Sequence, residues 1–94
     1  KEEPSGGNNY AVAMFEGRLR GEGPYNSVPL FIKSAKMGCL TAIKNLKKIY
    51  DPTFSRGMKN MIPEMPQGAI QHIEQQCIEV RKDNIFHVEL ALSL

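Results

Sequence analysis

Two stretches of this sequence place apolar residues at spacings of three and four, and a cysteine lies in the middle of each stripe. This periodicity is typical of a helix with one buried face. It predicts helices over residues 27–50 and 66–82, each with its cysteine turned toward the core. The first stripe consists of Val28, Ile32, Ala35, Cys39, Ala42, Leu46 and Ile49, and the second of Ile70, Ile73, Cys77 and Val80.

Cys39 and Cys77 would meet if these two helices packed side by side. A disulfide needs Cα atoms roughly 4.4–6.8 Å apart, which adjacent helices can supply. In the chain-entropy model such a bond would contribute on the order of 3–4 kcal/mol to stability. The alternative is a pair of free cysteines that act as small buried hydrophobic residues. We expect the disulfide between Cys39 and Cys77.

The chain outside these helices has the alternation of β-strands. Residues 85–94 alternate with a period of two over their whole length, which predicts a strand. Residues 10–19 are also predicted to form a strand, which ends at Gly21 and Gly23. Residues 53–65 leave two alternatives open, a short strand near 58–62 or an irregular loop.

The order of strand, helix, uncertain segment, helix and strand predicts an α+β fold. We expect a small two-layer sandwich, in which two helices pack on a mainly antiparallel sheet in a loosely ferredoxin-like β-α-(β)-α-β order. Residues 1–9 are rich in glycine and asparagine, and we expect them to form a flexible N-terminal lead. Residues 10–94 would then be a single domain, since 94 residues supply one modest core.

The first predicted helix carries five lysines and no acidic residue between Ser27 and Tyr50. Lys33, Lys36, Lys44 and Lys47 gather opposite the cysteine stripe, with Lys48 flanking them and Leu40 among them. Such a face could contact a protein or another acidic macromolecular surface. Nucleic acid is a weaker candidate, because the net charge is only +2 and no aromatic residues interleave with the lysines. The alternative is an ordinary solvated helix face.

The sequence contains no constellation typical of an enzyme. It has no phosphate-binding glycine motif, and its two histidines, His72 and His87, are isolated. No cysteine or histidine pair has the spacing of a metal site. We therefore expect no catalytic residues, no metal and no cofactor. No apolar run approaches the ~20 residues that cross a bilayer.

The segments A-K-M-G-C-L at residues 35–40 and I-E-Q-Q-C-I at residues 73–78 resemble the cysteine-bearing helices of fungal killer toxins and related secreted effectors. The resemblance covers the two helices and implies a small α/β sandwich. It carries no functional residue over to this chain.

The start at Lys1 without methionine favours a processed, secreted chain, with the cytoplasm as the alternative. With the paired cysteines and the missing catalytic groups, it predicts a secreted, non-enzymatic, effector-like or toxin-like protein that binds another macromolecule. The alternative is an intracellular α/β module that binds protein or nucleic acid through the lysine-rich helix face.

Overall fold

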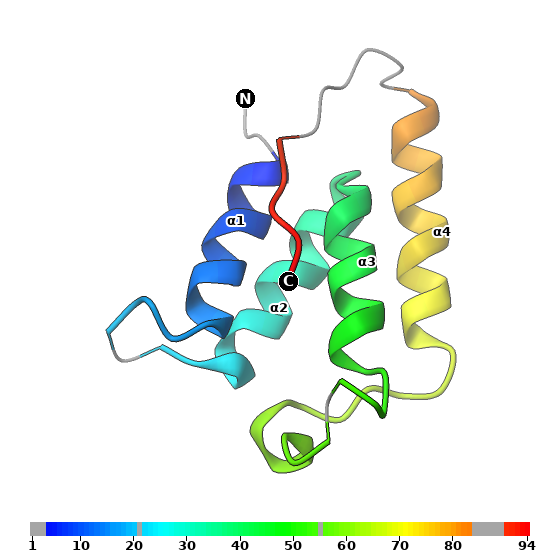
Figure 1. Cartoon of the computed structure of the whole chain (residues 1–94). Helices are drawn as coiled ribbons and strands as arrows, with labels where there is room; N and C mark the ends of the chain where they lie inside the picture. Colours follow the sequence, from blue (N-terminus) through cyan, green and yellow to red (C-terminus); the bar gives the residue numbers. More distant parts are fainter. Residues whose placement is uncertain (1–3, 21, 55, 84–89) are drawn as a thin grey trace.

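A computed structural model of the chain describes residues 4–20, 22–54, 56–83 and 90–94. All of the secondary structure in these residues is helical (Figure 1). The predicted α+β sandwich is therefore wrong. The elements are α1 (Pro4–Phe15), α2 (Pro24–Lys36), α3 (Leu40–Ile49), the 3₁₀ turn η1 (Lys59–Met61) and α4 (Ala69–Lys82).

Helix α1 occupies the place of the predicted first strand and of most of the predicted flexible lead. Asn8, Ala11 and Val12 are buried and Phe15 is partly buried, which is the spacing of one helical face. A short apolar run fits a strand or a buried helix equally well, so residues 10–15 alone could not decide. Gly7 lets α1 approach α2 closely, because a Cβ at this position would lie 2.6 Å from Ser34 Oγ.

The long helix predicted over 27–50 is two helices, which are separated by a turn at residues 37–39. Gly38 has a φ of 106°, a conformation that glycine adopts without strain. The amide of Cys39 donates to the carbonyl of Ser34 at 3.0 Å, a return typical of a helix that ends on such a glycine. The apolar stripe continues across the turn because both helices bury the sides that face each other, which hid the break from the sequence pattern.

Helix α4 confirms the second predicted helix, with its first residue at Ala69. Its last turn packs on the α2–α3 turn, where Arg81 Nη1 donates to the Gly38 carbonyl at 2.7 Å. Between α3 and α4 the chain forms loops and η1 rather than the short strand that was one of the two alternatives. Ile62 is the buried anchor of this connection.

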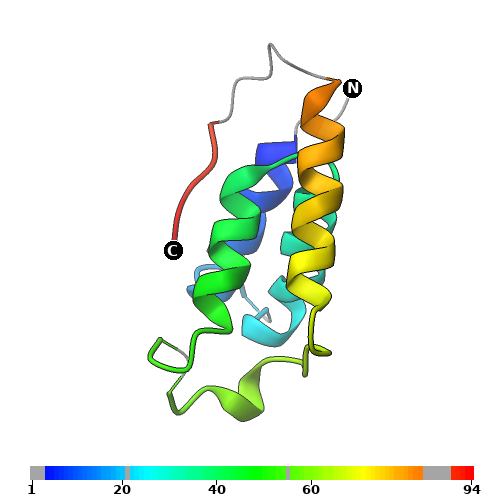
Figure 2. The ribbon, with the colours of Figure 1, turned by 90° about the vertical axis from the view of Figure 1, so that its right-hand side faces the viewer.

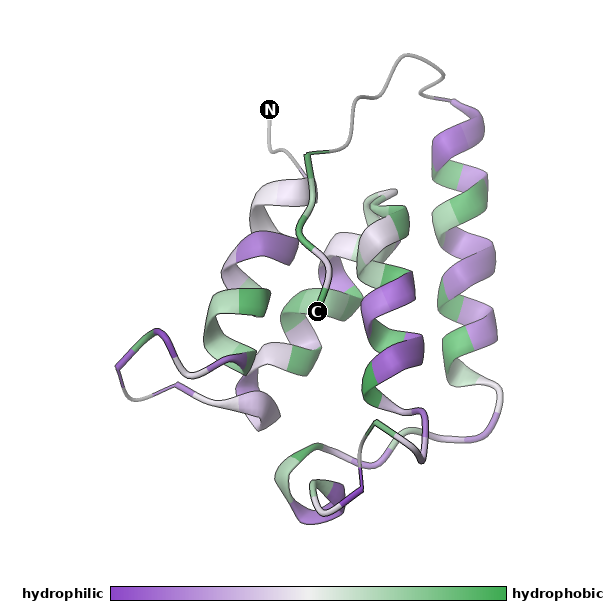
Figure 3. Ribbon diagram, in the orientation of Figure 1, coloured by the Kyte–Doolittle hydropathy of each residue, from purple (hydrophilic) through white to green (hydrophobic). Residues whose placement is uncertain are grey.

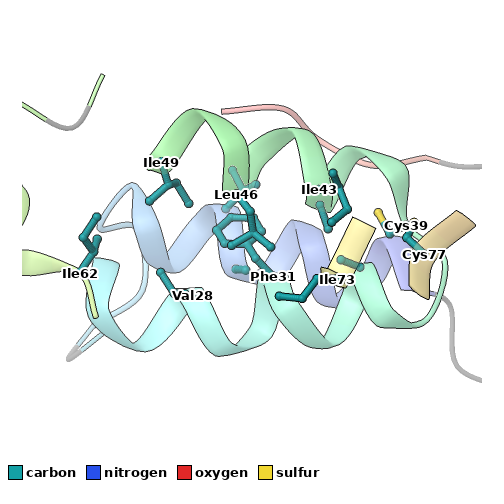
Figure 4. Packing of buried hydrophobic residues seen from close by; sticks show 13 residues of the cluster. Val28, Phe31, Cys39, Ile43, Leu46, Ile49, Ile62, Ile73 and Cys77 are labelled. Atoms are coloured by element: carbon teal, nitrogen blue, oxygen red, sulfur yellow. The ribbon is translucent and has the colours of Figure 1, made fainter. Parts of the chain in front are cut away.

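Successive helices run in opposite directions, and α2 contacts α1, α3 and α4 (Figure 1). The molecule is flat, with extents of 38 × 30 × 17 Å. Figure 4 shows the core around Phe31, Ile43, Leu46 and Ile73. The hydropathy colouring of Figure 3 shows the resulting alternation of apolar and polar positions along α3 and α4.

The predicted last strand, 85–94, falls partly outside the described residues, which resume at residue 90. Residues 90–94 are extended and lie between α1 and α3 (Figure 1). The described part of the chain contains no strand with which this segment could pair. Figure 2 shows the segment on the outer side of the helix layer.

Candidate functional site

Three asparagine side chains hold residues 90–94 by their backbone. Asn8 and Asn9 lie on α1, and Asn45 lies on α3. We call these three residues the asparagine clamp. Asn8 and Asn45 are 0% and 1% exposed, so their polar groups must find partners inside the protein.

Two of the amides each pair with the extended backbone through both of their polar atoms. Asn9 Nδ2 donates to the Leu90 carbonyl at 3.0 Å, and Asn9 Oδ1 accepts from the Leu92 amide at 2.7 Å. Asn45 repeats this pattern two residues later, since it donates to the Leu92 carbonyl and accepts from the Leu94 amide, each at 3.0 Å. Each side-chain amide thus takes the place of a peptide group in a neighbouring strand.

Asn8 connects the other two members of the clamp. Its Nδ2 donates to the Leu92 carbonyl at 2.9 Å and to Asn9 Oδ1 at 3.1 Å. Its Oδ1 accepts from Asn45 Nδ2 at 2.9 Å. Because a backbone amide can only donate and a backbone carbonyl can only accept, the extended segment fixes the orientation of every amide in this network.

Lys48 completes the site at the end of the segment. Its Nζ donates to the backbone oxygen of Leu94. The same ammonium lies 5.4 Å from the ring centroid of Phe54, which stacks on Phe15 of α1. Helices α1 and α3 and the loop after α3 therefore all contribute to holding residues 90–94.

Within the described residues, hydrogen bonds form along one edge of the extended segment. The bonded groups belong to Leu90, Leu92 and Leu94, and in an extended chain the groups of the intervening residues point to the opposite edge. Among the described residues, the amide and carbonyl groups of Ala91 and Ser93 have no hydrogen-bond partner. We call these four groups the free edge.

The side chains of the segment are unevenly buried. Ala91 and Leu94 pack against the core, whereas Leu90 and Leu92 are 77% and 48% exposed. Tyr10, which follows Asn9 on α1, is 53% exposed. The free edge therefore belongs to an extended segment that carries exposed leucine side chains, an arrangement typical of a surface that adds a strand.

The lysines predicted to bind a partner do not share one helix. The turn at Gly38 places Lys33 and Lys36 on α2 and Lys44 and Lys47 on α3. Lys47 Nζ lies 2.7 Å from Glu74 Oε2 of α4, so it is already paired. Lys33, Lys36 and Lys44 are exposed. Leu40, at the start of α3, was predicted to lie among the lysines, but it is partly buried and packs against the core.

Cys39 and Cys77 are fully buried and are not joined by a disulfide, so the predicted bond is wrong. They lie at the same end of the core, as Figure 4 shows. The periodicity correctly places both side chains inside, but it carries no information on the sulfur geometry that a bond requires. Both cysteines act as small apolar residues of the core.

A separate pocket of about 730 Å³ lies under the loop that follows α3. Tyr50, Ile62 and Met65 line it together with the exposed cations Arg56 and Lys59. The Tyr50 hydroxyl donates to the Pro63 carbonyl. Burial raises the pKa of Tyr50, with a smaller contribution from nearby Tyr25, so this hydroxyl stays protonated at neutral pH.

The part of the chain that the structure describes holds no candidate metal centre at either site. The described residues contain no group of three or more histidine, cysteine, aspartate or glutamate side chains that could hold a metal ion. None of the helices described here is long and apolar enough to span a bilayer. Comparison of the chain with protein families, with curated proteins and with solved structures gives no match.

None of the three clamp residues was predicted from the sequence. Asn8 and Asn9 stand beside Gly6 and Gly7, which favoured a flexible lead. Asn45 did leave a signal, because it falls between Ala42 and Ile49 on the buried side of a helix. A polar residue in an apolar stripe needs a partner, and here the partner is the backbone of residues 90–94.

Proposed function

We propose that this protein is a non-catalytic polypeptide-binding module, which binds an extended segment of a partner by adding it to the free edge of residues 90–94. The observation that supports this function best is the asparagine clamp. The clamp amides bond the backbone groups along one edge of the extended segment, and the opposite edge stays available for a partner. Strand addition of this kind gives affinity through main-chain hydrogen bonds.

The clamp also lowers the cost of binding. Fixing the backbone of a residue in one conformation costs about 1–2 kcal/mol of conformational entropy. If residues 90–94 were unordered, the free energy of binding would have to include that cost for each of them. Residues 90–94 are already extended and held at five backbone groups by Asn8, Asn9, Asn45 and Lys48. A partner strand therefore meets a preformed template.

The Ser93→Pro variant tests this function against a displayed library of random peptides. Proline at residue 93 removes one backbone donor from the free edge. It should leave the clamp intact, because proline is tolerated in an extended segment where the missing N–H would point away from the bonded side. We expect the wild-type protein to select peptides that Ser93→Pro does not retain. Ser93→Ala is the matched control and should retain them, because it keeps the backbone donor.

The clamp must stay intact for this comparison to be valid. Hydrogen exchange at the Leu92 and Leu94 amides, which donate to Asn9 and Asn45, reports on it directly. These amides should remain slow to exchange in Ser93→Pro. Selection of no peptides by the wild-type protein at a concentration where it is monomeric, or equal retention by Ser93→Pro with both amides protected, would contradict strand addition.

The basic surface supports a second candidate function, contact with an acidic macromolecule. Lys33, Lys36 and Lys44 are exposed, and no ion pair occupies them within the described residues. Lys47 and Lys48 are unsuitable for testing, because they bind Glu74 and Leu94. Changing only the three unoccupied lysines to glutamate therefore separates partner binding from the stability of the fold.

The triple variant is best compared with the wild type by fluorescence anisotropy on labelled polyglutamate and on labelled DNA. Basic-surface binding predicts affinity that falls steeply with salt and is lost in the variant. Absence of binding to both probes at low salt would rule out this second function.

We further propose that the protein acts as a secreted, effector-like binder, with the cytoplasm as the alternative compartment. Buried thiols are compatible with both, because a cysteine without exposure is protected from oxidants. Detection of the protein in the medium of the cells that produce it would support secretion, and detection only inside the cells would favour the alternative.

A further inference from the structure

We infer that the partner strand at the free edge is the same segment of a second copy of this chain, paired antiparallel about a two-fold axis at Leu92. This inference rests on the proposed function and names its partner. An isologous contact requires a surface that is complementary to itself. Residues 90–94 have this property in their backbone and in their side chains.

The backbone supplies the first argument. The free edge consists of the amide and carbonyl groups of Ala91 and Ser93, which stand on either side of Leu92. With the two-fold axis at Leu92, Ala91 of one copy lies opposite Ser93 of the other, and such a pair exchanges two hydrogen bonds in an antiparallel ladder. Two such pairs form, so all eight free groups of the two copies are used.

The side chains supply the second argument. In this register Leu92 lies opposite Leu92, and Leu90 lies opposite Leu94, all on one face of the pair. Directly opposed side chains in an antiparallel pair have Cβ atoms about 4.5–5.5 Å apart, within reach of leucine–leucine contact. The exposed side chains of Leu90 and Leu92 would thereby be covered. The segment contains no charged residue, so no like charges are brought together.

The position of the segment supplies the third argument. Residues 90–94 lie on the outer side of the helix layer, and Figure 2 shows no helix on the side of the segment that faces away from that layer. A second copy can therefore approach without displacing the clamp. A contact based on one five-residue strand is smaller than a standard protein interface, so we expect a weak dimer that forms in the micromolar to millimolar range.

The test is sedimentation velocity over that concentration range on the wild-type protein, Leu92→Lys and Ile78→Lys. Leu92→Lys sets two ammonium groups opposite each other at the two-fold axis and should weaken the dimer at least about tenfold, because like charges in opposed positions are destabilising. Ile78→Lys is the matched control, since Ile78 is an exposed apolar residue of α4, and it should dimerise as the wild type does.

A second measurement identifies the register. In a mixture of ¹³C-labelled and unlabelled protein, we expect an intermolecular nuclear Overhauser effect between the two Leu92 Hα atoms, which approach each other only in this register. A dimer that lacks this effect, or one that Leu92→Lys leaves unchanged, would overturn the inference. So would a wild-type protein that stays monomeric throughout the range.

The two proposals fail in different ways. A monomeric protein that still selects displayed peptides, and loses them in Ser93→Pro, would overturn the second copy as partner and keep strand addition as the function. A monomeric protein that selects no peptides would overturn both.

Discussion

Replacing Asn45 with alanine is expected to lower the free energy of unfolding by about 2–4 kcal/mol, because the change removes three hydrogen bonds at once. Asn45 donates to Asn8 Oδ1 and to the Leu92 carbonyl, and it accepts from the Leu94 amide. Two of these partners belong to the segment at 90–94 and the third is fully buried. Chemical denaturation followed by circular dichroism would measure the loss.

The same substitution at Asn60 is the control. Asn60 lies exposed in η1, so Asn60→Ala should change the free energy of unfolding by no more than about 0.5 kcal/mol. In Asn45→Ala the Leu94 amide should exchange with solvent much faster than in the wild type, since it loses its acceptor. A loss below about 1 kcal/mol with the Leu94 amide still protected would show that the clamp does not hold the segment.

Release of the segment should also weaken self-association. Asn45→Ala leaves the sequence of residues 90–94 unchanged, but it removes the order that makes their free edge a template. A dimer that persists in Asn45→Ala with a freely exchanging Leu94 amide would show that association does not depend on the clamp.

The sequence located much of the core but not the path of the chain. Most of the first predicted stripe is buried, with Ile32 only partly so, and both cysteines lie inside. These successes rest on periodicity, which reports which side of an element is covered. Periodicity does not report where a helix ends. Because the apolar stripe continues from α2 into α3, the turn at Gly38 could not be predicted from it.

Residues 10–15 show a second limit. Ala11, Val12 and Met14 are buried in a helix, although the same short run suits a strand. The residue that decides the matter is Asn8, which extends the buried face by one helical turn. Because asparagine is polar, Asn8 does not add to the apolar pattern from which a helix is predicted. The buried face of α1 therefore looked too short to be recognised as helical.

The clamp illustrates why the candidate site could not be predicted. Its members are Asn8, Asn9 and Asn45, and their partners are backbone groups more than forty residues away along the chain. Backbone groups are the same at every residue, so no motif or spacing marks them. The alternation in 85–94 predicted a strand, whereas residues 90–94 are extended but paired with side chains, so the described residues contain no sheet of the kind inferred from that strand.

Phe31→Ala is expected to lower the free energy of unfolding by about 3–5 kcal/mol. Phe31 is among the largest side chains that are fully buried. It projects from α2, the helix that contacts α1, α3 and α4, so its removal leaves a cavity at the centre of the molecule (Figure 4). Total stabilities of about 5–15 kcal/mol are usual, so this loss is a large share of the whole.

The Phe31→Leu variant separates cavity formation from other effects, because leucine fills most of the same space and should cost far less than alanine. Thermal unfolding of the three proteins should rank them as wild type, Phe31→Leu and Phe31→Ala. The loss in Phe31→Ala should also loosen the clamp, since α2 sets the spacing of α1 and α3, and the Leu92 and Leu94 amides should then exchange faster. An alanine variant that loses less than about 1.5 kcal/mol would show that α2 is not the centre of the packing.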